Sequence, residues 1–222
     1  MKWYFYPYYL INDLWLILRN RCLYYLYPNP PKDWKTGDKG NVILIPGTNA
    51  RWISLKKIAL AVHKQGYKIH FVKKLGGNSK PVADAVEDVA DYIKDNNLKD
   101  IILIGHSKGA IIAISLLKDP AIDKKIKKVI DIAGPLKGTL LSRFYASAKE
   151  LYPSSDLIKH FGEGIDMKKV ISIYPKIDDM IIPNKNLAGG NYENREINVF
   201  GHVRIIETKQ TVNEIKSILD SS

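Results

Sequence analysis

Short runs rich in apolar residues, alternating with helical patterns, constrain the fold of this chain more than any other feature. Runs of this kind are typical of strands that are buried on both faces of a parallel sheet. They occur at residues 42–45, 67–72, 101–104, 129–132, 170–173 and 197–200. Apolar residues with helical spacing occur at 55–62, 82–93, 110–117 and 211–219. The alternation predicts an α/β fold with a single, mostly parallel sheet of about six strands flanked by helices.

Length and composition limit the classes of protein that fit. The chain has 222 residues, of which 45% are hydrophobic and 26% charged, a balance typical of a protein with a sizeable core. It excludes a disordered protein, a collagen-like repeat and a polytopic membrane protein. The single cysteine, Cys22, excludes a disulfide scaffold and a cysteine-based metal cluster. One cysteine also fits a reducing compartment, so we expect a cytoplasmic protein.

The net charge of +11 raises the question of a nucleic-acid partner. The cations are mostly lysines spread along the whole chain, with the densest cluster at 124–128. No zinc-finger spacing, ribonucleoprotein aromatic motif or arginine-rich arm accompanies them. We therefore expect no nucleic-acid partner. A diffuse basic surface also suits contact with the anionic headgroups of a membrane.

Residues 1–40 differ from the rest of the chain, and we place a boundary between them and a globular domain at 41–222. Their apolar runs are shorter than the ~20 residues of a membrane span. One helical stripe is apolar and consists of Leu10, Ile11, Leu14, Trp15, Leu18, Cys22 and Tyr25. Two interpretations stay open. The helix either packs on its own domain or lies peripherally on a membrane, since Tyr, Trp and Arg suit the headgroup zone.

A G-x-S-x-G sequence at 105–109 directly follows a predicted buried strand and precedes a helix. A serine on such a sharp strand-to-helix turn needs small neighbours, because side chains at Gly105 and Gly109 would collide with adjacent backbone. The turn exposes the serine oxygen at a helix N-terminus, where partial positive charge favours a developing anion. The context therefore predicts that Ser107 is a nucleophile.

A nucleophilic serine needs a base that accepts its proton and an acid that orients the base. Chemistry in open α/β sheets gathers beyond the carboxyl ends of the strands. Among the five histidines, His202 lies in a loop at such an end and is the candidate base. Two adjacent acids, Asp178 and Asp179, follow the strand at 170–173. Spacing alone does not decide between them.

The chain order of these residues resembles that of the α/β-hydrolase family, and the serine turn resembles that of its lipases and esterases. The segment 179–183, with sequence DMIIP, is similar to the family's D-x-I/V-V-P pattern. That resemblance implies Asp179 as the triad acid, and Asp178 as a neighbour that is either solvated or in contact with the triad residues from outside. The Gly201-His202 pair resembles the family's Gly-His at the base. The segment 132–139 is similar to a G/T-P-x-x-G-S/T stretch of bacterial lipases. The resemblance covers about residues 41–222.

The resemblance also implies an oxyanion hole, which binds the negative oxygen of the tetrahedral intermediate. One donor is the N–H of Lys108, the residue after the nucleophile, and the other comes from the loop at 45–50. By analogy this second donor is Thr48, with Asn49 as the alternative. The loop reads Pro-Gly where the family more often has His-Gly.

The sequence also bears on the class of substrate. Residues 41–222 barely cover the core fold, so we expect a minimal lid or none. In the longest connection between strands, at 135–167, Leu140, Leu141 and Phe144 are the expected wall of an acyl pocket, with ordinary core packing as the alternative. The aromatic N-terminal helix and the basic surface then favour an esterase or lipase whose substrate is a small ester or lipid.

No feature of the sequence suggests a metal, a nucleotide or a flavin, so we expect no cofactor. The same triad would serve an acyltransferase or a thioesterase. A different class also fits, namely a non-catalytic protein that binds a membrane surface on a hydrolase scaffold.

Overall fold

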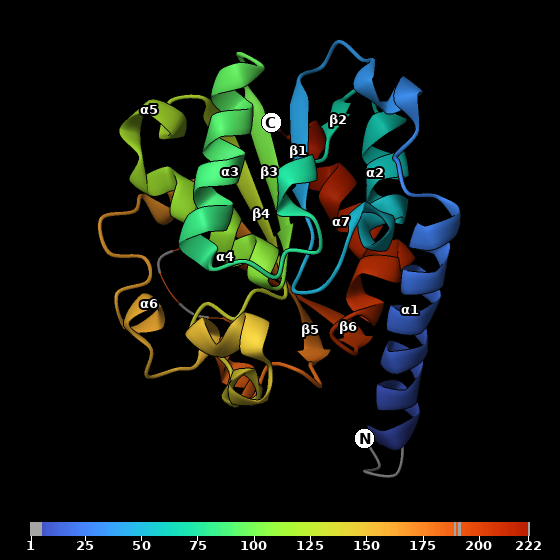
Figure 1. Cartoon of the computed structure of the whole chain (residues 1–222), viewed down its shortest axis with the longest axis vertical. Coiled ribbons are helices and arrows are strands. Elements are labelled where there is room, and N and C mark those ends of the chain that lie inside the picture. The colour runs from blue at the N-terminus through green and yellow to red at the C-terminus, as the bar shows by residue number, and fades with distance from the viewer. Residues whose placement is uncertain (1–5, 189, 191, 222) are drawn as a thin grey trace.

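Six parallel strands form one sheet in a computed structural model that describes residues 6–188, 190 and 192–221 (Figure 1). The strand order is β2-β1-β3-β4-β5-β6, and every neighbouring pair is parallel. The bounds are β1 Asn41–Ile45, β2 Lys68–His70, β3 Ile101–His106, β4 Ile126–Ile132, β5 Val170–Ile177 and β6 Glu193–Phe200. The predicted α/β fold and its single sheet are confirmed.

Helices cover both faces of the sheet. They are α1 Tyr6–Leu26, α2 Lys56–His63, α3 Val82–Asp95, α4 Lys108–Ser115, α5 Pro120–Asp123, α6 Asp156–Lys159 and α7 Lys209–Asp220. Figure 1 shows α3 and α4 on one face, with α2 and α7 on the other. Alternate residues of β1 therefore enter two separate cores, Val42 and Leu44 on one side and Ile43 and Ile45 on the other. Burial on both faces explains why these strands have apolar side chains at successive positions.

The carboxyl edge of the sheet is covered by the connection between β4 and β5. This connection contains two 3₁₀ helices, Leu140–Phe144 and Ala146–Leu151, followed by α6. They lie at the lower end of the sheet in Figure 1, where β5 and β6 also end. The short helices leave a cavity at that edge, which is where open α/β sheets place their sites.

Helix α1 packs on the domain through a face that carries both polar and apolar side chains. Asp13, Leu16 and Asn20 are buried, whereas the apolar stripe is exposed, from 47% at Leu10 to 75% at Tyr25. The helix therefore packs on the domain through a face other than this stripe. Polar contacts also hold it there, among them the ion pair of Arg19 with Glu207 and the hydrogen bonds of Asp13 described below.

Candidate active site

Ser107 occupies the turn between β3 and α4 in a backbone conformation that non-glycine residues rarely adopt. Its φ and ψ are 56° and −125°, a strained combination that persists only when the surroundings fix it. Glycine neighbours make the turn fit. A Cβ on Gly105 would lie 2.4 Å from the carbonyl oxygen of Gly109, and one on Gly109 would lie 2.1 Å from that of Ile45. The serine is thereby held at the first turn of α4.

The side chain of Lys108 fixes the turn from the side away from solvent. It is fully buried, and its Nζ donates to the carbonyl of Ser147 at 2.9 Å and to that of Lys80. The same Nζ forms an ion pair with Glu150 at 3.0 Å. A buried ammonium is tolerated when its donors are satisfied in this way. The turn at Ser107 is thus attached to the 3₁₀ helix Ala146–Leu151, which covers the cavity.

The backbone N–H groups of Lys108, Thr48 and Asn49 are the candidate donors to an oxyanion beside Ser107. The loop after β1 approaches the serine closely, since a Cβ on Gly47 would lie 3.1 Å from the Cβ of Ser107. Thr48 and Asn49 both line the cavity. Within the described residues the N–H groups of Lys108, Thr48 and Asn49 donate no hydrogen bond. The geometry therefore leaves the choice between Thr48 and Asn49 open.

Asp178, and not Asp179, is hydrogen bonded to the His202 ring. Its Oδ2 lies 2.8 Å from Nδ1 of His202, and both side chains are buried. The other oxygen of Asp178 accepts the N–H groups of Met180 and Ile181, each at 2.8 Å. This tight turn directly after β5 aims Oδ2 at the imidazole. The assignment of the orienting acid to Asp179 is therefore corrected, and so is the expectation that Asp178 is solvated.

Asp179 contacts the backbone of His202 instead of its ring. Its Oδ1 accepts the His202 N–H at 2.8 Å. Both carboxylates lie in the turn after β5, which sends them to different parts of the same histidine. Its Oδ2 is buried and has no hydrogen-bond partner among the described residues. Asp179 thus holds the loop that carries the histidine.

The electrostatic surroundings favour a histidine that carries a proton readily. Burial alone would lower the pKa of the His202 imidazole. The carboxylate of Asp178, helped by Asp179 and Asp13, outweighs burial and raises the pKa above its usual value. The acid therefore both orients the ring and stabilises its protonated form.

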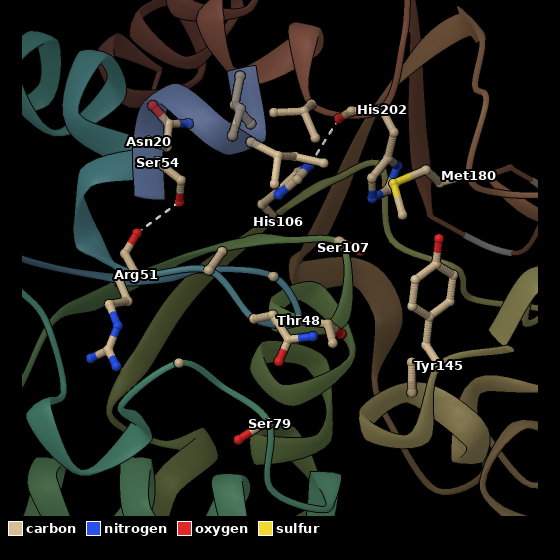
Figure 2. A pocket seen from close by; sticks show the side chains of 18 of the residues that line it. Asn20, Thr48, Arg51, Ser54, Ser79, His106, Ser107, Tyr145, Met180 and His202 are labelled. Carbon is tan, nitrogen blue, oxygen red and sulfur yellow. Dashed lines mark hydrogen bonds between the residues drawn. The ribbon is translucent and has the colours of Figure 1, made fainter. Parts of the chain in front are cut away.

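His106 is a second histidine at the site, and the sequence-based interpretation assigned it no role. Burial, helped by the charge of His202, lowers the pKa of His106 to about 3, so the ring is neutral. Its Nε2 lies 3.0 Å from the carbonyl oxygen of His202 (Figure 2), to which the N–H donates. The one sequence feature that could have placed His106 at the site is its position directly before Ser107.

A cavity of about 710 Å³ brings the candidate residues together, and both Ser107 and His202 line it (Figure 2). Within the described residues the two side chains share no hydrogen bond. Catalytic hydrogen bonds are often long in the absence of substrate. Apolar walls come from Leu14 and Ile17 of α1 and from Leu141 of the connection.

Only part of the expected acyl wall faces the cavity. Leu141 lines it, but Leu140 and Phe144 are exposed to solvent. The expectation for these two is corrected, because the 3₁₀ helix Leu140–Phe144 turns their side chains to solvent and Leu141 toward the cavity. Tyr145, Met180 and residues of α1 complete the wall.

Within the described part of the chain no group of three or more His, Cys, Asp and Glu side chains could hold a metal ion.

Comparison with protein families gives a match over most of the sheet. Residues 67–200 match the model of the family described as PGAP1-like alpha/beta domain. The matched segment contains Ser107, Asp178 and Asp179 and ends two residues before His202. No curated protein sequence matches the chain significantly.

Solved structures share the fold at low sequence identity. A putative non-heme bromoperoxidase from Mycobacterium tuberculosis is 13% identical, with a TM-score of 0.66 over 83% of this chain and 93% of that one. A carboxylesterase from Nitrososphaera gargenis is 15% identical, with a TM-score of 0.63 over 83% and 92%. A lipase from Bacillus licheniformis is 16% identical, with a TM-score of 0.59 over 86% and 94%.

Proposed function

This chain belongs to the PGAP1-like alpha/beta domain family and has the α/β-hydrolase fold, and from this premise we propose that it is a serine hydrolase of carboxylic esters. One observation carries the proposal. His202, hydrogen bonded to Asp178, and a serine on a strained turn line one cavity together with Thr48 and Asn49 of the loop after β1. These are the parts that acyl transfer through a covalent intermediate requires.

In the proposed mechanism Ser107 Oγ attacks the acyl carbon while His202 Nε2 accepts its proton. The imidazolium is stabilised by Asp178 and then gives the proton to the leaving alcohol. The N–H groups of Lys108 and of Thr48, with Asn49 as the alternative, bind the oxyanion, and loss of one such donor typically lowers turnover by ~10²–10³. Water, activated by His202, attacks the acyl-enzyme and releases the acid.

Labelling with a fluorophosphonate probe tests this proposal directly. The probe reacts with a serine only when base and oxyanion donors are assembled around it. We expect mass spectrometry to find the label on Ser107 of folded protein and to find none after heat denaturation. Absence of label on folded protein contradicts the proposal. Transfer of the acyl group to an added alcohol or thiol, in place of water, would reassign the chain to the acyltransferases.

We also propose that the exposed stripe of α1 contacts a membrane with anionic headgroups. Large apolar side chains rarely gather on a solvent-exposed helix without a partner. Cations border the aromatic side chains of this helix, with Arg19 5.3 Å from the Trp15 ring and Arg204 5.5 Å from that of Tyr9. Lys56 lies 5.8 Å from the ring of Tyr27, which directly follows the helix. Within the described residues, every helix is too short or too polar to cross a bilayer. This arrangement suits a helix that lies in the headgroup zone.

The double variant Ile11→Ser/Leu18→Ser tests membrane contact. Each residue is more than 60% exposed and neither lines the cavity, so the change removes apolar area only from the proposed membrane face. Burial of such a side chain contributes about 1.5–3 kcal/mol, so we expect binding to vesicles with phosphatidylserine to fall at least about 10-fold in a sedimentation assay. Leu60→Ser, an exposed leucine on α2, is the matched control. Equal binding by wild type and double variant contradicts membrane contact through α1.

A further inference from the structure

Helix α1 places a buried carboxylate directly under the loop that carries His202. Asp13 is 2% exposed. Its Oδ2 accepts the N–H of Val203 at 2.5 Å, and its Oδ1 accepts that of Arg204 at 3.0 Å. Gly201 makes the approach fit, since a Cβ there would lie 2.7 Å from Oδ1 of Asp13, and its φ is +109°. Asp13, a residue of the N-terminal segment, thus forms hydrogen bonds with Val203 and Arg204, the two residues after the candidate base.

The other residues that contact this loop bind His202 itself, and among the described residues only Asp13 binds the two residues after it. His106 donates to the carbonyl of His202, and Asp179 accepts the His202 N–H. Asp178 holds the ring. None of these groups contacts the backbone N–H groups of Val203 and Arg204, which therefore depend on Asp13.

Seating of α1 does not depend on Asp13 alone. Leu16, one turn further along the same face, is buried in the core, and Arg19 forms an ion pair with Glu207. Burial of a carboxylate is unfavourable, and an apolar side chain often serves as well or better where only packing is needed. Burial, followed by the charge of Asp179, raises the pKa of Asp13 to about 7. An unfavourable buried charge at this place suggests a role beyond anchoring the helix.

We propose that Asp13 is a positioning residue that fixes the His202 loop and thereby aims the imidazole at Ser107. This inference rests on the proposed function, because it takes His202 as the base. It makes the contact of Asp13 with this loop a condition for full activity of the site, and Asp13 lies outside the segment matched by the family model.

Two variants of the full chain separate positioning from anchoring. Asp13→Asn keeps the shape of the side chain but has only one acceptor oxygen. The N–H groups of Val203 and Arg204 each need one, so one of them loses its hydrogen bond. We expect its kcat for a short soluble ester to fall about 10- to 100-fold, since a displacement of about 1 Å in a catalytic group has effects of this size. KM and the unfolding midpoint should change little. Leu16→Ala should lower the unfolding midpoint and leave the kcat of the folded protein unchanged.

Nuclear magnetic resonance of the His202 ring gives a readout that is independent of turnover. Since the pKa of Asp13 is about 7, its carboxylate is negative over the upper part of the His202 titration and there favours the imidazolium. In Asp13→Asn this charge is absent, so the pKa of His202 should fall and its titration midpoint should move to lower pH. The other titratable groups around the ring are the same in both variants and are Asp178, Asp179, Asp131 and His106. We expect no shift in Leu16→Ala.

The outcomes distinguish this inference from the proposed function. An unchanged kcat and an unchanged His202 titration in Asp13→Asn overturn the positioning role, and so do parallel losses in Asp13→Asn and Leu16→Ala. A wild-type chain without turnover or label counts against the proposed function. In that case the titration still decides whether Asp13 governs the His202 ring.

Discussion

Ser107→Ala is expected to lower turnover of a short soluble ester by about 10⁵- to 10⁶-fold, the range seen when a triad nucleophile is removed. The proposed reaction passes through a bond between Ser107 Oγ and the acyl carbon, and no other hydroxyl lies on the elbow. Steady-state kinetics with a chromogenic ester measures the loss. The expected residual rate is that of substrate bound beside oxyanion donors without a nucleophile.

A matched serine variant controls for effects of the substitution itself. Ser217 is exposed on α7, away from the cavity, and Ser217→Ala should retain wild-type turnover. Fluorophosphonate labelling should be lost in Ser107→Ala and kept in Ser217→Ala. If Ser107→Ala still hydrolyses the ester at a rate near that of wild type, another nucleophile acts and the mechanism proposed for the elbow is wrong.

Two-sided burial makes the sheet predictable from the sequence. Four of the six runs, those in β1, β3, β4 and β5, have side chains buried at successive positions, as expected for strands covered by helices on both faces. Strands β2 and β6 alternate buried with more exposed side chains. The turn at Ser107 was predictable for a similar reason, since its glycines are required by backbone contacts within a few residues. Strands and turns that depend on contacts with nearby residues can therefore be predicted from a single sequence.

The choice between Asp178 and Asp179 depends on detail that spacing does not contain. The strand β5 ends at Ile177, and the turn of Asp178 around the N–H groups of Met180 and Ile181 decides which carboxylate meets the ring. A shift of one residue in the end of the strand would exchange the two roles. The family pattern, read from the sequence, favoured the wrong neighbour for this reason.

The orientation of α1 was unpredictable for another reason. An apolar stripe normally identifies the buried face of a helix, but here the buried face includes Asp13 and Asn20. The partners of Asp13 lie 190 and 191 positions away along the chain. No local periodicity reports a contact between a helix and a loop at such separation, so only the folded structure reveals it.

Asp178→Asn is expected to lower turnover by about 10⁴-fold, the effect of the same substitution in a serine protease triad. The structure gives the reason. Oδ1 of Asp178 accepts two backbone N–H groups, so the amide oxygen of asparagine would take that place and its NH₂ would face Nδ1 of His202. The ring must then accept at Nδ1 and carry its proton on Nε2, where it cannot take the proton of Ser107.

Asp179→Asn is the matched neighbour and should lower turnover less than about 10-fold, because the amide oxygen can still accept the His202 N–H. The pH dependence separates the two carboxylates further. Asp178 is the strongest influence that raises the pKa of His202, so the acidic limb of kcat/KM should move to lower pH by more in Asp178→Asn than in Asp179→Asn. A larger loss of turnover in Asp179→Asn than in Asp178→Asn would restore Asp179 as the orienting acid, and it would mean that the pair rearranges when substrate binds.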